Sequence, residues 1–160
     1  MSEKVLPLKV DRILVAIDGS ADSEKAGLTA VDLAERYSAQ IFILHVSNYP
    51  QDTLGFGSTH TVAVGLPQPD PEVDKEGKRA QEMMDRIEKI AANRGVTATS
   101  EIIEDASSRI SDTILDYGYR EDVDLIVTGS RGLNAYLRST MGSVSTGVVN
   151  RARCSVLVVK

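Results

Sequence analysis

Three glycines in the last third of the chain have the spacing of a phosphate-binding loop. Gly129 follows the short apolar run 125–127, Gly132 lies three residues later, and Gly142 immediately precedes Ser143. Glycine lets backbone N–H groups approach an anion without an intervening Cβ atom. A helix start adds unpaired N–H donors and a partial positive charge. The stretch therefore predicts a strand, a glycine loop and a helix N-terminus that together bind phosphate.

The residues around this loop offer further partners for phosphate but no catalytic group. Ser143 and Ser145 carry hydroxyls within reach of phosphate oxygens, and Arg131 either neutralises phosphate charge or faces solvent. A P-loop needs a lysine beside its Ser or Thr, and no lysine occurs between Lys89 and Lys160. No Ser-His-Asp, Cys-His or clustered metal-ligand pattern is readable. We therefore predict no catalytic residue and no metal bound by protein side chains.

Length and composition bound the class of protein. A chain of 160 residues is expected to form one domain over residues 1–160, and its 42% hydrophobic and 26% charged residues are typical of soluble globular proteins. The net charge of −5 argues against nucleic acid as a partner. No apolar run reaches the roughly 18 residues that cross a membrane. A single cysteine, Cys154, and no apolar leader predict a cytoplasmic protein.

Strand-like and helix-like stretches alternate along the chain, and these elements must position the loop. Apolar runs predict strands over 12–18, 39–46, 96–103, 123–128 and 154–159. Apolar residues at helical spacing predict helices after Ser20, over 72–94, after Ser107 or Ser108, and over about 143–152. In the first helix the residues expected on the buried face are Ala26, Ala30, Leu33, Ala34 and Tyr37.

The alternation predicts an α/β fold with a parallel sheet and helices on both of its faces. In such sheets ligands bind at the carboxyl ends of strands, where the strand order reverses. Asp18 at the end of the first strand and Gly129 at the end of the fourth would then share one crevice. Ordinary turn glycines, the alternative interpretation of the loop, would not predict this convergence. The stretch 47–71, rich in Pro and Gly, is expected to be a mobile or disordered loop.

The chain resembles the universal stress protein family of the nucleotide-binding type. The similarity covers nearly the whole length and includes the opening Ile-Leu-Val-Ala-Ile-Asp-Gly-Ser at 13–20, Leu-His-Val at 44–46 and Val-Leu-Val-Val at 156–159. Its most specific part is the ATP signature Gly-x2-Gly-x9-Gly-(Ser/Thr), which the three glycines and Ser143 match without a gap. The resemblance implies a Rossmann-like five-stranded sheet of order 3-2-1-4-5, a homodimer, and ATP bound with Mg2+ through its phosphates.

Site residues carry over from the family by matching position. The adenine and ribose end would be lined by Ala16, Ile17, Asp18, Val46, Thr128 and Gly129. The phosphates would be held by Gly132, Gly142, Ser143, Val144 and Ser145, with Arg131 as a candidate counter-charge. Asp18 either accepts from an amine or ribose hydroxyl or serves as a turn former. The chain departs from the family after the third strand, where Glu104 and Asp105 put acidic groups near the crevice.

Three functions remain open at this point. The first is an ATP-binding regulatory or stress-response module, the second a slow ATPase or autophosphorylating protein, and the third a partner-binding scaffold that needs no nucleotide. The intact signature argues against the scaffold, because nothing else in the sequence demands those glycines. The resemblance also places the apolar strand 155–159 at the sheet edge, where it invites antiparallel pairing with a second copy of the chain.

Overall fold

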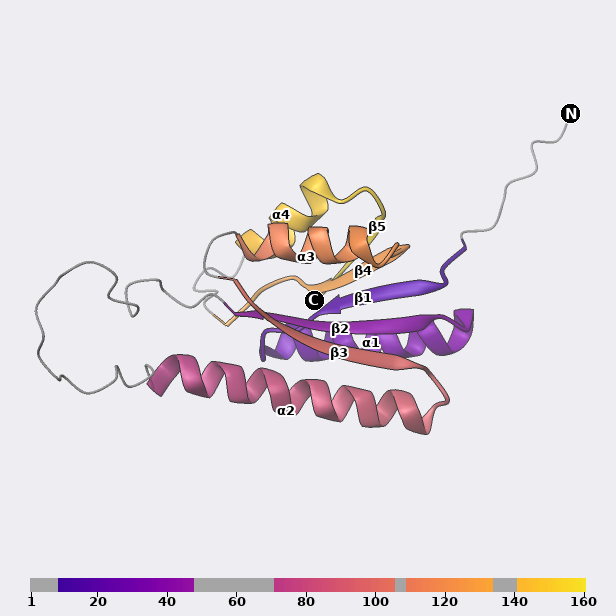
Figure 1. Cartoon of the computed structure of the whole chain (residues 1–160), viewed down its shortest axis with the longest axis horizontal. Helices are drawn as coiled ribbons and strands as arrows, with labels where there is room; N and C mark the ends of the chain where they lie inside the picture. Colours follow the sequence, from indigo (N-terminus) through magenta and orange to yellow (C-terminus); the bar gives the residue numbers. More distant parts are fainter. Residues whose placement is uncertain (1–8, 48–70, 106–108, 134–140) are drawn as a thin grey trace, which may run out of the picture.

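The computed structural model describes residues 9–47, 71–105, 109–133 and 141–160, and they form one sheet with four helices (Figure 1). The strands are β1 (Arg12–Ala16), β2 (Gln40–Ser47), β3 (Ala98–Glu104), β4 (Leu125–Gly129) and β5 (Ser155–Val159). The helices are α1 (Ala21–Tyr37), α2 (Pro71–Asn93), α3 (Ile110–Arg120) and α4 (Ser143–Arg151). Within the described ranges, no helix is both long and apolar enough to cross a membrane. The predicted loop 47–71 lies, apart from its two ends, outside the described residues.

All strand pairs are parallel, and the strand order is β3-β2-β1-β4-β5. This order confirms the predicted sheet. The strands β2 and β3 therefore lie on one side of β1, and the later strands β4 and β5 lie on its other side. Ala16, at the end of β1, is paired with Leu44 on one side and with Thr128 on the other. Strands β1 and β4 thus end at nearly the same level, and β2 continues beyond them to Ser47.

Helices cover both faces of the sheet, as the alternation predicts. Helices α1 (purple) and α2 (rose) pack on one face of the sheet (Figure 1). On this face Ile13, Val15 and Ile43 belong to one core with Met84 and Ile87 of α2. Helices α3 and α4 pack on the other face, against a second core. Its members include Leu14, Phe42, Leu44, Ile114 and Ile126. Successive residues of each strand point to opposite faces, so every central strand serves both cores.

Helix α1 begins as the sequence predicts, and its buried face ends earlier than expected. The hydroxyl of Ser20 accepts from the Ser23 amide at 3.2 Å, so Ser20 is the N-cap. Of the predicted face, Ala26, Ala30 and Ala34 are fully buried, and Leu33 packs partly against the core. The prediction for Tyr37 is wrong, because this residue ends the helix and is 48% exposed. Val31 of the same helix is buried in the core.

Several element ends differ from the predicted ones by one to two residues. Strand β1 ends at Ala16 because Asp18 already turns the chain, and β4 begins at Leu125 rather than residue 123. Strand β3 begins at Ala98, since Gly95 with φ +70° ends α2 and sends the chain back to the sheet. Helix α3 has Arg109 at its N-cap, without a side-chain cap bond, while the predicted caps Ser107 and Ser108 lie outside the described residues.

Candidate functional site

A cavity of about 660 Å3 opens at the carboxyl ends of the central strands. All twelve residues predicted for nucleotide binding line it: Ala16, Ile17, Asp18, Val46, Thr128, Gly129, Arg131, Gly132, Gly142, Ser143, Val144 and Ser145. They come from β1, β2 and β4, from the loop after β4 and from the first turn of α4. The sheet brings them together because the strand order reverses at this point.

The start of α4 faces the cavity with backbone donors. Gly142 is the N-cap residue and makes no side-chain cap bond, and the first turn of the helix contains no acidic residue. The first intrahelical bond runs from the Thr146 amide to the Gly142 carbonyl at 2.9 Å. By helix geometry the amides of Ser143, Val144 and Ser145 have no carbonyl one turn earlier. This end of the cavity therefore has the donors and the dipole direction that suit an anion.

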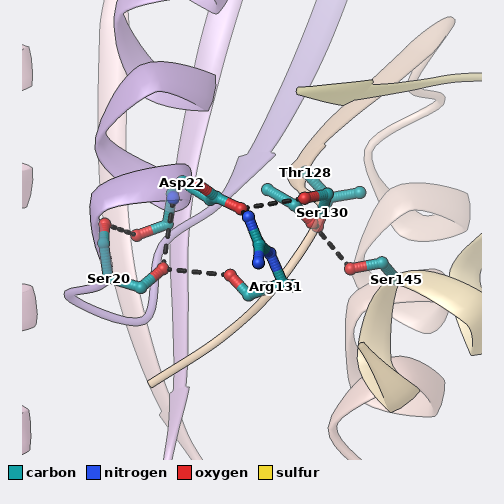
Figure 2. Close-up of polar contacts among 8 residues, drawn as sticks. Ser20, Asp22, Thr128, Ser130, Arg131 and Ser145 are labelled. Atoms are coloured by element: carbon teal, nitrogen blue, oxygen red, sulfur yellow. Dashed lines mark hydrogen bonds and ion pairs between the residues drawn. The ribbon is translucent and has the colours of Figure 1, made fainter. Parts of the chain in front are cut away.

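The loop that follows β4 is hydrogen-bonded to the start of α1 (Figure 2). The hydroxyl of Ser130 donates to the Asp22 carboxylate at 2.8 Å, and the hydroxyl of Ser20 donates to the Arg131 carbonyl at 3.3 Å. The Gly142 amide donates to the Ser130 carbonyl at 2.8 Å, which closes the glycine loop at its far end. The starts of α1 and α4, which are distant in sequence, thus hold Ser130 and Arg131 in place.

Gly129 is required by packing within the fold. A Cβ atom on Gly129 would lie 2.8 Å from the backbone carbon of Asp22 and 2.8 Å from the amide nitrogen of Ser23. Among the described residues, positive φ angles of glycine occur at Gly19 and Gly95, so none of the signature glycines needs a left-handed backbone. The expectation that only an anion demands these glycines is therefore wrong for Gly129, because close contact with α1 demands it too.

Asp18 acts as a turn former and also lines the cavity. Its Oδ1 accepts from the Ser20 amide at 2.9 Å, the bond of an Asx turn that leads into α1. A Cβ atom on Gly132 would lie 2.6 Å from the other carboxylate oxygen, Oδ2. Glycine at 132 thus leaves room for the Asp18 carboxylate at the cavity wall. Both roles that the sequence left open for Asp18 are sterically compatible.

The Ser145 hydroxyl differs from its predicted role. It donates to the Gly129 carbonyl at 2.6 Å, and the residue is 4% exposed. A hydroxyl has one hydrogen to donate, so this bond leaves none for a phosphate oxygen. The backbone N–H of Ser145 still lies in the first turn of α4. Ser145 therefore links the two ends of the glycine loop and offers its amide, not its hydroxyl, to an anion.

Helix α2 contributes lining residues to the cavity that the sequence did not indicate. Glu76, Lys78 and Gln81, in the first turns of α2, also line the cavity. The helical pattern places Ala80 and Met84 on the buried face of α2, and both are buried. That pattern does not say which turn of the helix reaches the strand ends, because helical periodicity gives a face and not a position along the sheet. Glu104, predicted to lie near the crevice, lines it as well.

His45 and Cys154 are the histidine and the cysteine within the described residues. His45 is 7% exposed and its Nδ1 lies 2.8 Å from the Ile17 carbonyl, so it is a packed, hydrogen-bonded histidine. Cys154 is half-buried, and burial raises the pKa of its thiol. A raised pKa lowers the thiolate fraction at neutral pH and so its reactivity. In the part of the chain described here, no three His, Cys, Asp or Glu residues form a possible metal-binding group.

Comparison with known proteins places the whole described fold within one family. The model of the universal stress protein family matches residues 9–160. Universal stress protein YxiE of Bacillus subtilis is 34% identical over 155 residues, covering 94% of this chain and 99% of that protein. Universal stress protein UspA of Lactobacillus plantarum superposes with a TM-score of 0.73 at 28% identity, covering 95% of this chain and 99% of the other.

Two more distant structures hold adenine nucleotides. A universal stress protein in complex with cAMP superposes with a TM-score of 0.67 at 21% identity, covering 95% of this chain and 98% of the other. A universal stress protein of Archaeoglobus fulgidus in complex with dAMP gives a TM-score of 0.62 at 19% identity, covering 96% and 99%. At these identities the similarity shows a shared fold, and the bound nucleotides are properties of those proteins.

Proposed function

This chain belongs to the universal stress protein family, and we propose that it binds ATP and acts as a nucleotide-dependent regulatory module of the stress response. One observation carries the proposal. The residues that match the family's nucleotide site all line a single cavity, and the start of α4 opens into it. Structures of the same fold with cAMP and dAMP support an adenine nucleotide as the ligand class.

The cavity offers different chemistry at its two ends. Ala16, Ile17 and Val46 present strand-end backbone and apolar side chains, which suit the flat faces of adenine. Asp18 has a carboxylate that can accept from an amine or a ribose hydroxyl. At the other end, the amides of 143–145 and the Arg131 guanidinium suit phosphate oxygens. The nucleotide would therefore lie with its base over β1 and β2 and its phosphates at α4.

Mg2+ would enter with the nucleotide. The phosphate end of the cavity supplies backbone amides, the Arg131 guanidinium and the Ser143 hydroxyl, and the amides and the guanidinium are donors to oxygen anions and not metal ligands. Mg2+ typically keeps several waters and takes its other ligands from the phosphates of a nucleotide. The residues present thus fit ATP–Mg2+ without a dedicated metal site. The ion would reduce the charge that the protein must neutralise.

The test begins with the nucleotide itself. Freshly purified protein is denatured and the released small molecules are identified by mass spectrometry, and ATP–Mg2+ is then titrated calorimetrically into emptied protein. We expect about one ATP per chain and a saturable heat. GTP–Mg2+ serves as the matched control for the base end of the cavity. The absence of released nucleotide together with no heat on titration would overturn the proposal in favour of a partner-binding scaffold.

We also propose that the chain forms a homodimer through β5. The strand lies at the sheet edge, paired with β4 alone, and carries Val156 and Leu157, the latter 36% exposed. An apolar edge strand invites pairing with another chain. Light scattering at micromolar concentration should give twice the chain mass, and Leu157→Arg should reduce it. Leu28→Arg, at a similarly exposed leucine of α1, is the control. A wild-type monomer would refute this arrangement.

A further inference from the structure

Arg131, the candidate counter-charge for phosphate, is paired with a carboxylate of the fold itself. Its Nε lies 3.6 Å from the Oδ2 atom of Asp22 (Figure 2). Arg131 lines the cavity and its side chain is 39% exposed, whereas Asp22 does not line the cavity and is 13% exposed. The carboxylate therefore lies behind the arginine, where a ligand in the cavity would meet the guanidinium first.

Asp22 is held in place by contacts that do not depend on Arg131. Its Oδ2 accepts from the Ser130 hydroxyl at 2.8 Å. It lies in the first turn of α1, where the helix dipole favours a carboxylate. Its backbone and Cβ lie so close to Gly129 that a Cβ atom there would come within 3.0 Å of both. If the guanidinium moves toward a phosphate, Asp22 cannot follow it.

We propose that Asp22 is a positioning residue that restrains Arg131 and thereby lowers the affinity of the cavity for the phosphates of a nucleotide. This inference rests on the proposed function. A carboxylate and a phosphate compete for the N–H donors of one guanidinium, which matches both anions in geometry. Full engagement of Arg131 with phosphate loosens its pair with Asp22. The restraint therefore acts on the phosphates and leaves the nucleoside part of the ligand untouched.

Asp22→Asn is the informative change, because it removes the charge and keeps an oxygen that can accept from Ser130. Calorimetric titrations of ATP–Mg2+ and of adenosine are compared for wild type and variant. We expect about threefold tighter ATP binding, the size of a partly exposed ion pair, and unchanged adenosine binding. Asp32→Asn is the matched control: Asp32 is also on α1 and also pairs with an arginine, Arg94, but Arg94, unlike Arg131, does not line the cavity.

A double-mutant cycle with Arg131→Gln separates restraint from simple charge repulsion. The gain from Asp22→Asn should vanish in the Arg131→Gln background. An equal gain in that background would mean that Asp22 only repels phosphate through space, and would overturn the inference. Weaker binding of both ATP and adenosine would show a structural role instead, and no change would also overturn it. Failure of the wild type to bind ATP would remove both this inference and the proposed function.

Discussion

The two ends of the glycine loop carry the same residue type for different physical reasons. At the end of β4, Gly129 touches the backbone of α1 so closely that a side chain would overlap Asp22 and Ser23. At the start of α4, a Cβ atom on Gly142 would meet nothing nearer than 3.5 Å. The first glycine is required by the fold, whereas packing leaves room for a side chain at the second. A signature motif can therefore contain a glycine that the fold demands beside one that it does not.

The largest predicted effect should come from a substitution of Gly129, at the packed end of the glycine loop. We expect Gly129→Ala to lower the free energy of unfolding by about 1–3 kcal/mol, because the added methyl group overlaps backbone atoms that cannot move away without shifting α1. Urea unfolding followed by circular dichroism measures the change. Gly77→Ala, at a described glycine with nothing within 4 Å of the added atom, is the control. An unfolding midpoint equal to wild type would remove the distinction between the two ends.

A substitution of Gly142, at the open end of the glycine loop, should change the affinity for ATP and not the stability of the fold. In Gly142→Asp the new carboxylate is a favoured N-cap and would occupy the amides at the start of α4. We expect at least roughly tenfold weaker ATP binding, about 1.4 kcal/mol, with the thermal unfolding midpoint unchanged or raised. Gly142→Asn, a neutral cap of the same shape, should lose less affinity. If Gly142→Asp bound ATP like wild type, the start of α4 could not be the phosphate site.

The smallest predicted effect should come from loss of the hydrogen bond between Ser145 and Gly129, which joins the two ends of the glycine loop. Ser145→Ala removes the hydroxyl that donates to the Gly129 carbonyl at 2.6 Å and leaves a buried acceptor without that partner. We expect a loss of about 1 kcal/mol in unfolding free energy. The affinity for ATP should change little, because the Ser145 amide remains in place. Denaturant titration and calorimetry on the same variant test both statements. A large loss of affinity at full stability would return the hydroxyl to the phosphate site.

The sequence was sufficient to predict the sheet, and the twelve site residues that it nominates all line the cavity. Apolar runs and helical spacing follow from burial, so the alternation of strands and helices could be read directly. The resemblance supplied the order of the strands, and the sheet then brought Asp18, Val46 and Gly129 to one place. The N-cap at Ser20 was also predictable, because it needs only local geometry.

The remaining features depend on contacts between segments far apart in the chain. No local pattern shows that Gly129 touches α1, or that the Ser145 hydroxyl is used by the Gly129 carbonyl. The pairing of Asp22 with Arg131 joins residues that the sequence assigns to unrelated elements. Tyr37 fits the helical period of α1 but is the last residue of the helix and is exposed. Periodicity predicts a face and not its extent.

The strand order has a consequence for the synthesis of the protein. β1 lies in the middle of the sheet, but its second neighbour, β4, begins only at Leu125. A nascent chain that has emerged as far as Glu104 holds three strands, leaves one edge of β1 unpaired and lacks the glycine loop. Such an intermediate has the cavity residues of β1 and β2 but lacks those of β4, the glycine loop and α4. The cavity is therefore completed only after α4 has been synthesised, because the lining comes from both sides of β1.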